Sequence, residues 1–142
     1  MLKTFFRYSG ILILLVILSN CSDSIVESTP SITDEKEVTK VAAKFSEIQT
    51  EIFDQSCAFS GCHSGSVNPN LSGNSYTNIV NKQSSTGMSY IKPNDPDNSY
   101  LLQKILGSSG ISGSRMPAGS SPLSQEQIDA LVEWINDGAQ NN

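Results

Sequence analysis

The sequence from residue 57 to residue 63 is Cys57-Ala58-Phe59-Ser60-Gly61-Cys62-His63. It places two thiols and the sole imidazole of the 142-residue chain within seven consecutive positions. Thiols and imidazole are common ligands of metals and attachment points of metal-containing groups. We therefore expect this stretch to be the functional site, with the rest of the fold arranged around it.

The order of these side chains resembles the Cys-x-x-Cys-His signature of covalent haem attachment. In that signature the two cysteines form thioethers with the porphyrin vinyl groups and the histidine ligates iron. Here four residues separate the cysteines, so the two additional residues must bulge outward, for which Ser60 and Gly61 are suitable. The stretch predicts one haem c, attached to Cys57 and Cys62 and ligated by His63.

A second iron ligand must come from elsewhere, because the chain has no other histidine. The two candidates are Met88 and Met116. Met116 is favoured, since it lies far along the chain in a glycine-rich loop and Pro117 stiffens its backbone. A thioether opposite histidine raises the reduction potential relative to two histidines. The neighbouring Arg115 could pair with a haem propionate.

The flanking sequence predicts helices. Asp34, with Glu37 three residues later, can cap an amphipathic helix that ends close to Cys57. Its apolar positions are Val38, Val41, Ala42, Phe45, Ile48, Ile52 and Phe53. The uncharged stretch 55–81 should be mainly loop, with one short helix at 75–80.

Two further helices follow. Asp95 can cap a helix that begins at Pro96 and ends at Gly107. Its predicted buried stripe is Leu101, Leu102, Ile105 and Leu106. Ser124 and Gln127 form a capping box for a last helix, which ends at Gly138 and buries Trp134. No segment alternates with period two, so the fold class is all-α.

The first 20 residues predict an export signal, because Lys3 and Arg7 precede an apolar run too short to span a bilayer comfortably. The stretch Leu18-Ser19-Asn20-Cys21 resembles a lipobox, in which Cys21 becomes an acylated membrane anchor. The alternative is an uncleaved N-terminal helix in the same membrane. Residues 21–33 then form a flexible tether and residues 34–142 the haem domain. Either reading places the domain in the cell envelope, facing the periplasm or the cell exterior.

Charge limits the partners. The chain has 9 basic and 14 acidic side chains, a net charge of −5. Lys3 and Arg7 are the basic residues of the first 20, so the rest of the chain carries 7 basic and 14 acidic side chains, or −7. Such a surface excludes nucleic acid and favours basic or neutral redox partner proteins.

Residues 48–139 resemble a family of small bacterial cytochrome c domains, of the type first described in planctomycetes. The resemblance rests on Cys62-His63-Ser64-Gly65, on Lys92-Pro93-Asn94-Asp95-Pro96, on Arg115-Met116-Pro117 and on the stretch from Leu123 to Ala139. It implies haem attached at Cys57 and Cys62, with His63 and Met116 as iron ligands. We predict a class I cytochrome c-like bundle, in which the helix ending near Cys57 packs across the last helix. This fold would serve a membrane-anchored single-electron carrier.

Three alternatives remain. Cys57 and Cys62 could form a disulfide that staples a haem-free binding domain. The same cluster could bind zinc, although a fourth ligand is lacking. A haem iron with an open sixth position could support peroxidase chemistry, which would make the protein an enzyme rather than a carrier.

Overall fold

The computed structural model describes residues 40–142. The predicted signal, the acylation of Cys21, the tether and the Asp34 cap lie outside these residues. Within the described range, every helix is too short or too polar to pass through a bilayer.

The first helical segment runs from Phe45 to Ser56, in three consecutive parts. These are α1 (Phe45–Glu47), the π-helical η1 (Ile48–Phe53) and α2 (Asp54–Ser56). The prediction that this helix already includes Val41 and Ala42 is wrong. Lys44 is extended, with φ −124° and ψ 141°. The amides of Phe45 and Ser46 donate to the side chain and the carbonyl of Asn142, at 2.9 Å each, so a residue distant in sequence caps the helix.

This segment buries one face. Phe45, Ile48, Ile52 and Phe53 are at most 4 % exposed, as predicted. A polar residue shares the face, because Gln49 is 7 % exposed.

The chain between the first helix and α4 is mostly loop, as predicted. The short helix expected at 75–80 is confirmed as α3 (Tyr76–Ile79). Two isolated bridges follow, pairing Val80 with Ile91 and Gln83 with Ser89.

Helix α4 (Tyr100–Leu106) begins four residues later than predicted. Asp95 does cap a turn, since its carboxylate accepts the amide of Asn98 at 3.2 Å, but the turn ends there. The Ser99 hydroxyl donates to the Asp95 carbonyl and accepts the Lys92 amide, which holds Ser99 extended. The first amides of α4 then donate outside the helix, that of Tyr100 to the carbonyl of Ser89 and that of Leu101 to the carbonyl of Tyr90, both at 2.9 Å.

The buried stripe of α4 is shorter than predicted. Leu101, Leu102 and Ile105 are buried, but Leu106 is 51 % exposed. Gly107 ends the helix in the left-handed conformation, with φ 70°, as expected.

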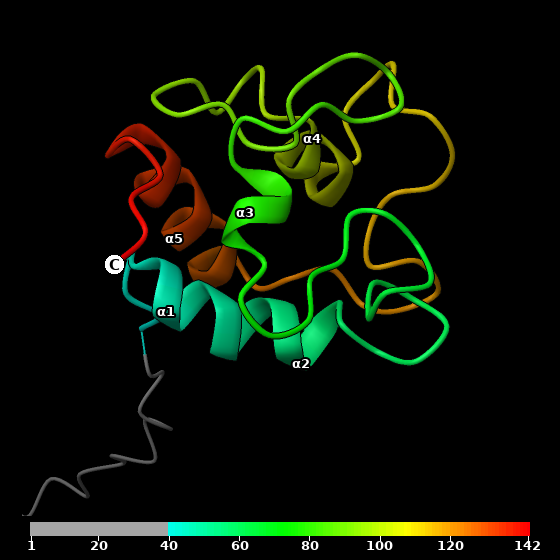
Figure 1. Cartoon of the computed structure of the whole chain (residues 1–142), viewed down its shortest axis with the longest axis horizontal. Coiled ribbons are helices and arrows are strands. Elements are labelled where there is room, and N and C mark those ends of the chain that lie inside the picture. Colours follow the sequence, from blue (N-terminus) through cyan, green and yellow to red (C-terminus); the bar gives the residue numbers. More distant parts are fainter. Residues whose placement is uncertain (1–39) are drawn as a thin grey trace, which may run out of the picture. The chain divides into compact units, whose positions relative to one another are not determined.

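Helix α5 (Gln125–Asn136) has the predicted capping box, with both reciprocal hydrogen bonds between Ser124 and Gln127. Trp134 is buried, and its ring centroid lies 5.7 Å from that of Phe45. The first helical segment packs against α5, and Figure 1 shows the two side by side with α3 and α4 beyond them. Helices are the only regular elements in residues 40–142, so the all-α class is confirmed there.

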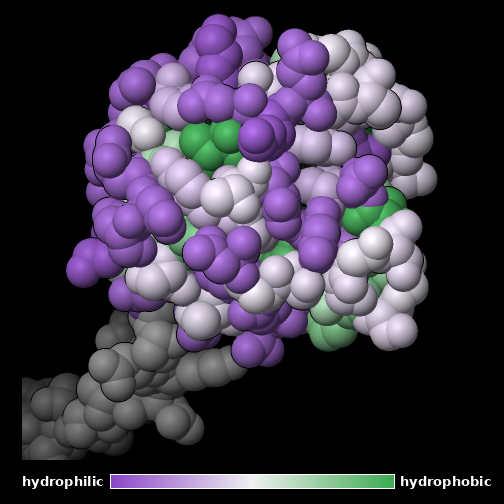
Figure 2. Space-filling view, viewed as in Figure 1, coloured by the Kyte–Doolittle hydropathy of each residue, from purple (hydrophilic) through white to green (hydrophobic). Residues whose placement is uncertain are grey.

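Large apolar side chains are rare on the surface of the described part. On the face in Figure 2 they form small patches among hydrophilic residues. The exposed large hydrophobic residues are Phe59, Val67 and Leu106. Two of these lie close in sequence to Cys62 and His63.

Candidate functional site

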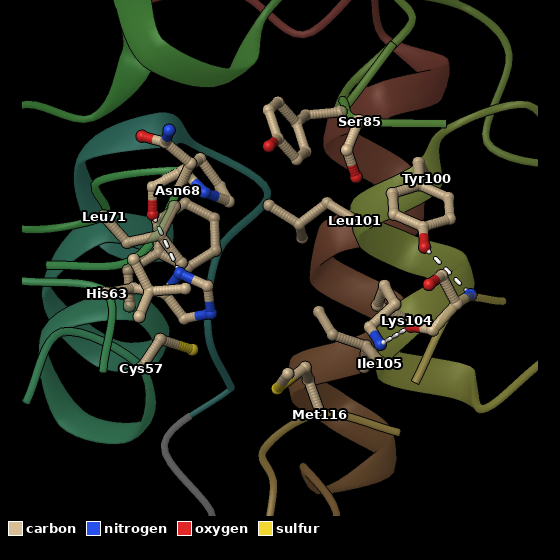
Figure 3. Close-up of a pocket in the computed structure, with 15 residues that line it drawn as sticks. Cys57, His63, Asn68, Leu71, Ser85, Tyr100, Leu101, Lys104, Ile105 and Met116 are labelled. Carbon is tan, nitrogen blue, oxygen red and sulfur yellow. Dashed lines mark hydrogen bonds between the residues drawn. The ribbon is translucent and has the colours of Figure 1, made fainter. Parts of the chain in front are cut away.

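A pocket of about 210 Å³ lies between the segment after α2 and helix α4. Figure 3 shows Cys57, His63 and Leu71 on one wall and Leu101, Ile105 and Met116 on the other. Its remaining lining residues are Phe53, Val67, Asn68, Pro69, Ser85, Tyr90, Tyr100, Lys104 and Ser112. The pocket is thus largely apolar, with an imidazole and a thioether on facing walls.

The two cysteines lie at the two sides of a turn. The Cys62 amide donates to the Phe59 carbonyl at 2.9 Å, and Gly61 in between has φ 82°. Phe59, Ser60 and Gly61 are exposed, so the additional residues do bulge outward. Cys57 is partly buried and lines the pocket, whereas Cys62 is exposed. Burial, and to a lesser extent the nearby Cys62, raises the pKa of the Cys57 thiol to about 11.

His63 is oriented by a backbone carbonyl. Its Nδ1 lies 2.9 Å from the carbonyl oxygen of Pro69. A carbonyl can only accept, so Nδ1 of the neutral ring carries the proton and Nε2 keeps its lone pair. Figure 3 shows this second nitrogen turned toward the pocket. The His63 carbonyl also accepts the Leu71 amide at 2.7 Å, which closes the segment after His63 onto the pocket wall.

Of the two candidate methionines, the structure brings only Met116 to the pocket. Its sulfur points into the cavity from the wall opposite His63 (Figure 3). Met88 is partly buried in the loop before Ser89 and is not part of the lining. The Met116 amide donates to the carbonyl of Lys104 at 2.8 Å, which ties this ligand candidate to α4.

Arg115 does not line the pocket. Its guanidinium donates to the carbonyls of Met116 and Ser120, at 2.9 and 3.1 Å. The side chain also covers Gly107, where a Cβ would lie 3.1 Å from its Cγ. In this arrangement Arg115 stabilises the methionine loop, a contact that differs from the predicted pairing with a propionate.

Sequence reasoning missed Gln49 and Lys104. Gln49 Nε2 donates to the carbonyl of Leu71, and its Oε1 accepts both the amide and the hydroxyl of Ser75. Its position was visible in the sequence, because residues 45, 48, 49, 52 and 53 all share one helical face. Lys104 lines the pocket beside Met116, and its position on α4 alone gave no signal for this.

The described part of the chain contains neither the disulfide nor the zinc-ligand cluster that Cys57 and Cys62 could form. Cys57 and Cys62 are free thiols. Among residues 40–142, no three His, Cys, Asp or Glu side chains converge in a way that could hold a metal ion.

The residues present fit a covalently bound haem. The apolar lining suits a porphyrin, the free Nε2 of His63 and the Met116 sulfur are iron ligands of the appropriate kind, and Cys57 lines the same cavity. Among residues 40–142, no buried side-chain polar atom lacks a hydrogen-bond partner.

Residues 49–135, more than half of the chain, match the family model described as cytochrome C oxidase, cbb3-type, subunit III. The matched stretch contains Cys57, Cys62, His63 and Met116. Comparison with curated proteins and with solved structures found no match.

Proposed function

The chain belongs to the cytochrome c family that its residues 49–135 match, and we propose that it is a monohaem electron carrier with His63 and Met116 as iron ligands. A cytochrome c domain of this kind binds haem c covalently and transfers electrons. The observation that carries the proposal for this chain is the facing placement of the His63 ring and the Met116 sulfur across one apolar pocket.

In the proposed holoprotein, Cys57 and Cys62 would hold the haem by thioethers and His63 would ligate the iron from the same side. When bound, the haem supplies an iron that gains and loses one electron. The Pro69 carbonyl fixes the tautomer and the orientation of His63. This hydrogen bond also makes Nε2 a more basic metal ligand. The buried side chains of Phe53, Leu101 and Ile105 exclude water from the pocket.

We also propose that the domain acts outside the cytoplasm, held to the membrane at Cys21. The support is the sequence of residues 1–21, with its basic start, its apolar run and its lipobox-like end. The exposed Phe59, within the attachment stretch, and the exposed Val67, shortly after it, suit brief contact with a redox partner. The lack of charge between residues 55 and 81 keeps that contact free of strong ionic interactions.

Covalent haem retention tests the function. We expect protein produced with a haem-attachment system to keep its haem after denaturation and solvent extraction, with a reversible one-electron redox step. The Cys57→Ala/Cys62→Ala variant, produced in the same way, should release its haem on extraction. Wild-type protein that yields no covalent haem would reject the cytochrome proposal.

Variants of the two methionines test the ligand. Met116→Ala should abolish the weak red absorption band of the methionine–iron bond and lower the reduction potential, because a thioether ligand favours ferrous iron. Met88→Ala is the matched control and should leave both properties unchanged. Loss of the band in the Met88 variant alone would show that the ligand was assigned to the wrong residue.

A further inference from the structure

Lys104 connects helix α4 to the loop that carries Met116, and the function proposed above gives it no task. We propose that Lys104 is a positioning residue, which holds the loop 112–116 so that the Met116 sulfur stays in the pocket. This inference rests on the proposed function, in which Met116 ligates iron.

Three hydrogen bonds join Lys104 to this loop. Its carbonyl accepts the Met116 amide at 2.8 Å. Its Nζ donates to the carbonyl of Ser112 at 2.7 Å and to the carbonyl of Ser114. One side chain and its own backbone therefore hold both ends of the five-residue stretch.

The same face of α4 supplies a fourth contact. Tyr100, one turn before Lys104, accepts the Ser112 amide on its phenol oxygen at 3.1 Å. In Figure 3 one dashed line starts at Tyr100 and another at Lys104, both beside the pocket. Because α4 is itself anchored by the carbonyls of Ser89 and Tyr90, it gives the loop a rigid support.

The loop needs such a support. Residues 108–124 form no regular element, so ordering them costs conformational entropy that few internal contacts offset. Gly113 turns the chain between the two carbonyls, with φ 72°, and a Cβ there would lie 3.9 Å from the Lys104 Nζ. An ammonium has three donors and no acceptor, which suits two converging carbonyl oxygens.

The expected consequence concerns the fraction of molecules in which Met116 is detached from iron. Hydrogen bonds from a charged donor are stronger than neutral ones, but Nζ is accessible to water, which can replace part of the interaction. Removing the two hydrogen bonds from the Lys104 Nζ should raise the fraction of molecules with detached Met116 roughly tenfold.

Imidazole binding to the ferric holoprotein measures this fraction, because imidazole occupies the iron only where methionine has left it. We expect Lys104→Leu to bind imidazole roughly tenfold more tightly than wild type. Lys104→Arg keeps donors on a long side chain and should recover most of the wild-type value. The matched control is Lys82→Leu, which removes the same charge from a residue whose backbone bonds Ile79 and Tyr90 rather than the loop. Its imidazole affinity should stay at the wild-type value.

Far-UV circular dichroism of the same variants separates positioning from general stability. If Lys104 only stabilises the fold, its replacement should change imidazole affinity only as much as the decrease in the unfolding midpoint explains. If it positions Met116, imidazole affinity should change more than the midpoint does. If Lys104→Leu does not fold, Tyr100→Phe removes the acceptor of the Ser112 amide and should tighten imidazole binding in the same direction, by a smaller factor.

Equal imidazole affinity in Lys104→Leu and Lys82→Leu would overturn the inference. Its failure can be distinguished from that of the proposed function. If Met116→Ala retains the methionine–iron band, the ligand assignment itself is wrong. If Met116→Ala loses the band and Lys104→Leu behaves like wild type, only the role of Lys104 is rejected.

Discussion

At the scale of single residues, the two cysteines have unlike surroundings. Cys57 is partly buried against the core, and Cys62 is exposed on the outward turn. The thiolate is the reactive form of cysteine, and burial disfavours it. Before haem is attached, the two thiols should therefore differ in reactivity.

Alkylation of haem-free protein measures this difference. The pKa of the Cys57 thiol is about 11 rather than 9.0, so near neutral pH it should be alkylated about a hundredfold more slowly in the folded protein than in urea. The Cys62→Ser and Cys57→Ser variants each leave one thiol in the stretch 57–63, and mass spectrometry of the peptides separates it from Cys21. Cys62, which is exposed, should gain much less from unfolding. Equal protection of both thiols would contradict the burial of Cys57.

The raised pKa of the Cys57 thiol also makes the stability of the haem-free protein depend on pH. Below pH 9 the thiol is protonated in the folded and the unfolded protein, and its burial carries no ionic cost. Above pH 9 the unfolded chain loses this proton first, so the stability of the haem-free protein falls as the pH approaches 11.

At the scale of elements, the π-helical segment η1 presents Gln49 to the chain that carries the histidine. The amide of Gln49 bonds Leu71 and Ser75 and also donates to Asp54 at 2.7 Å. Leu71 in turn donates to the carbonyl of His63. One side chain therefore connects the first helix to the pocket wall on which His63 lies.

Replacing this amide should be costly. Gln49→Leu keeps a similar volume but leaves the Leu71 carbonyl and the Ser75 amide buried without a partner, which should lower the free energy of unfolding by about 3 kcal/mol. Gln55→Leu, at an exposed position of α2 in the same helical run, is the control and should change the free energy of unfolding by less than about 0.5 kcal/mol. Urea titration of both holoproteins makes the comparison. A loss below about 1 kcal/mol for Gln49→Leu would show that water replaces the lost bonds.

The ends of the helices show where the local sequence is enough to predict a boundary. The capping box of α5 and the glycine that ends α4 are contained within a few residues, and both were predicted correctly. The starts of the first helical segment and of α4 were not. Their first amides bond Asn142 in one case and Ser89 and Tyr90 in the other, and such distant partners leave no local signal.

At the scale of the whole molecule, the sequence predicted the all-α class of residues 40–142 and three of the residues that line the pocket, Cys57, His63 and Met116, because each has a strong local signature. His63 follows Cys62 directly, and Met116 precedes a proline between two helices. The roles of Arg115 and Lys104 depend on which of two cations faces the pocket, and the folded loop decides this. The sequence placed Arg115 beside Met116, whereas the structure places Lys104 in the lining.

The bond between Asn142 and the start of α1 has one more consequence. The start of the first helix and the last residue of the described domain therefore lie side by side. Cys57 follows the opposite end of this 12-residue helical segment, roughly 15 Å away. A fusion protein or a chemical linker joined at either end would stand clear of the pocket. If the protein were immobilised on an electrode through the side at which Phe45 and Asn142 meet, the pocket would face the solution.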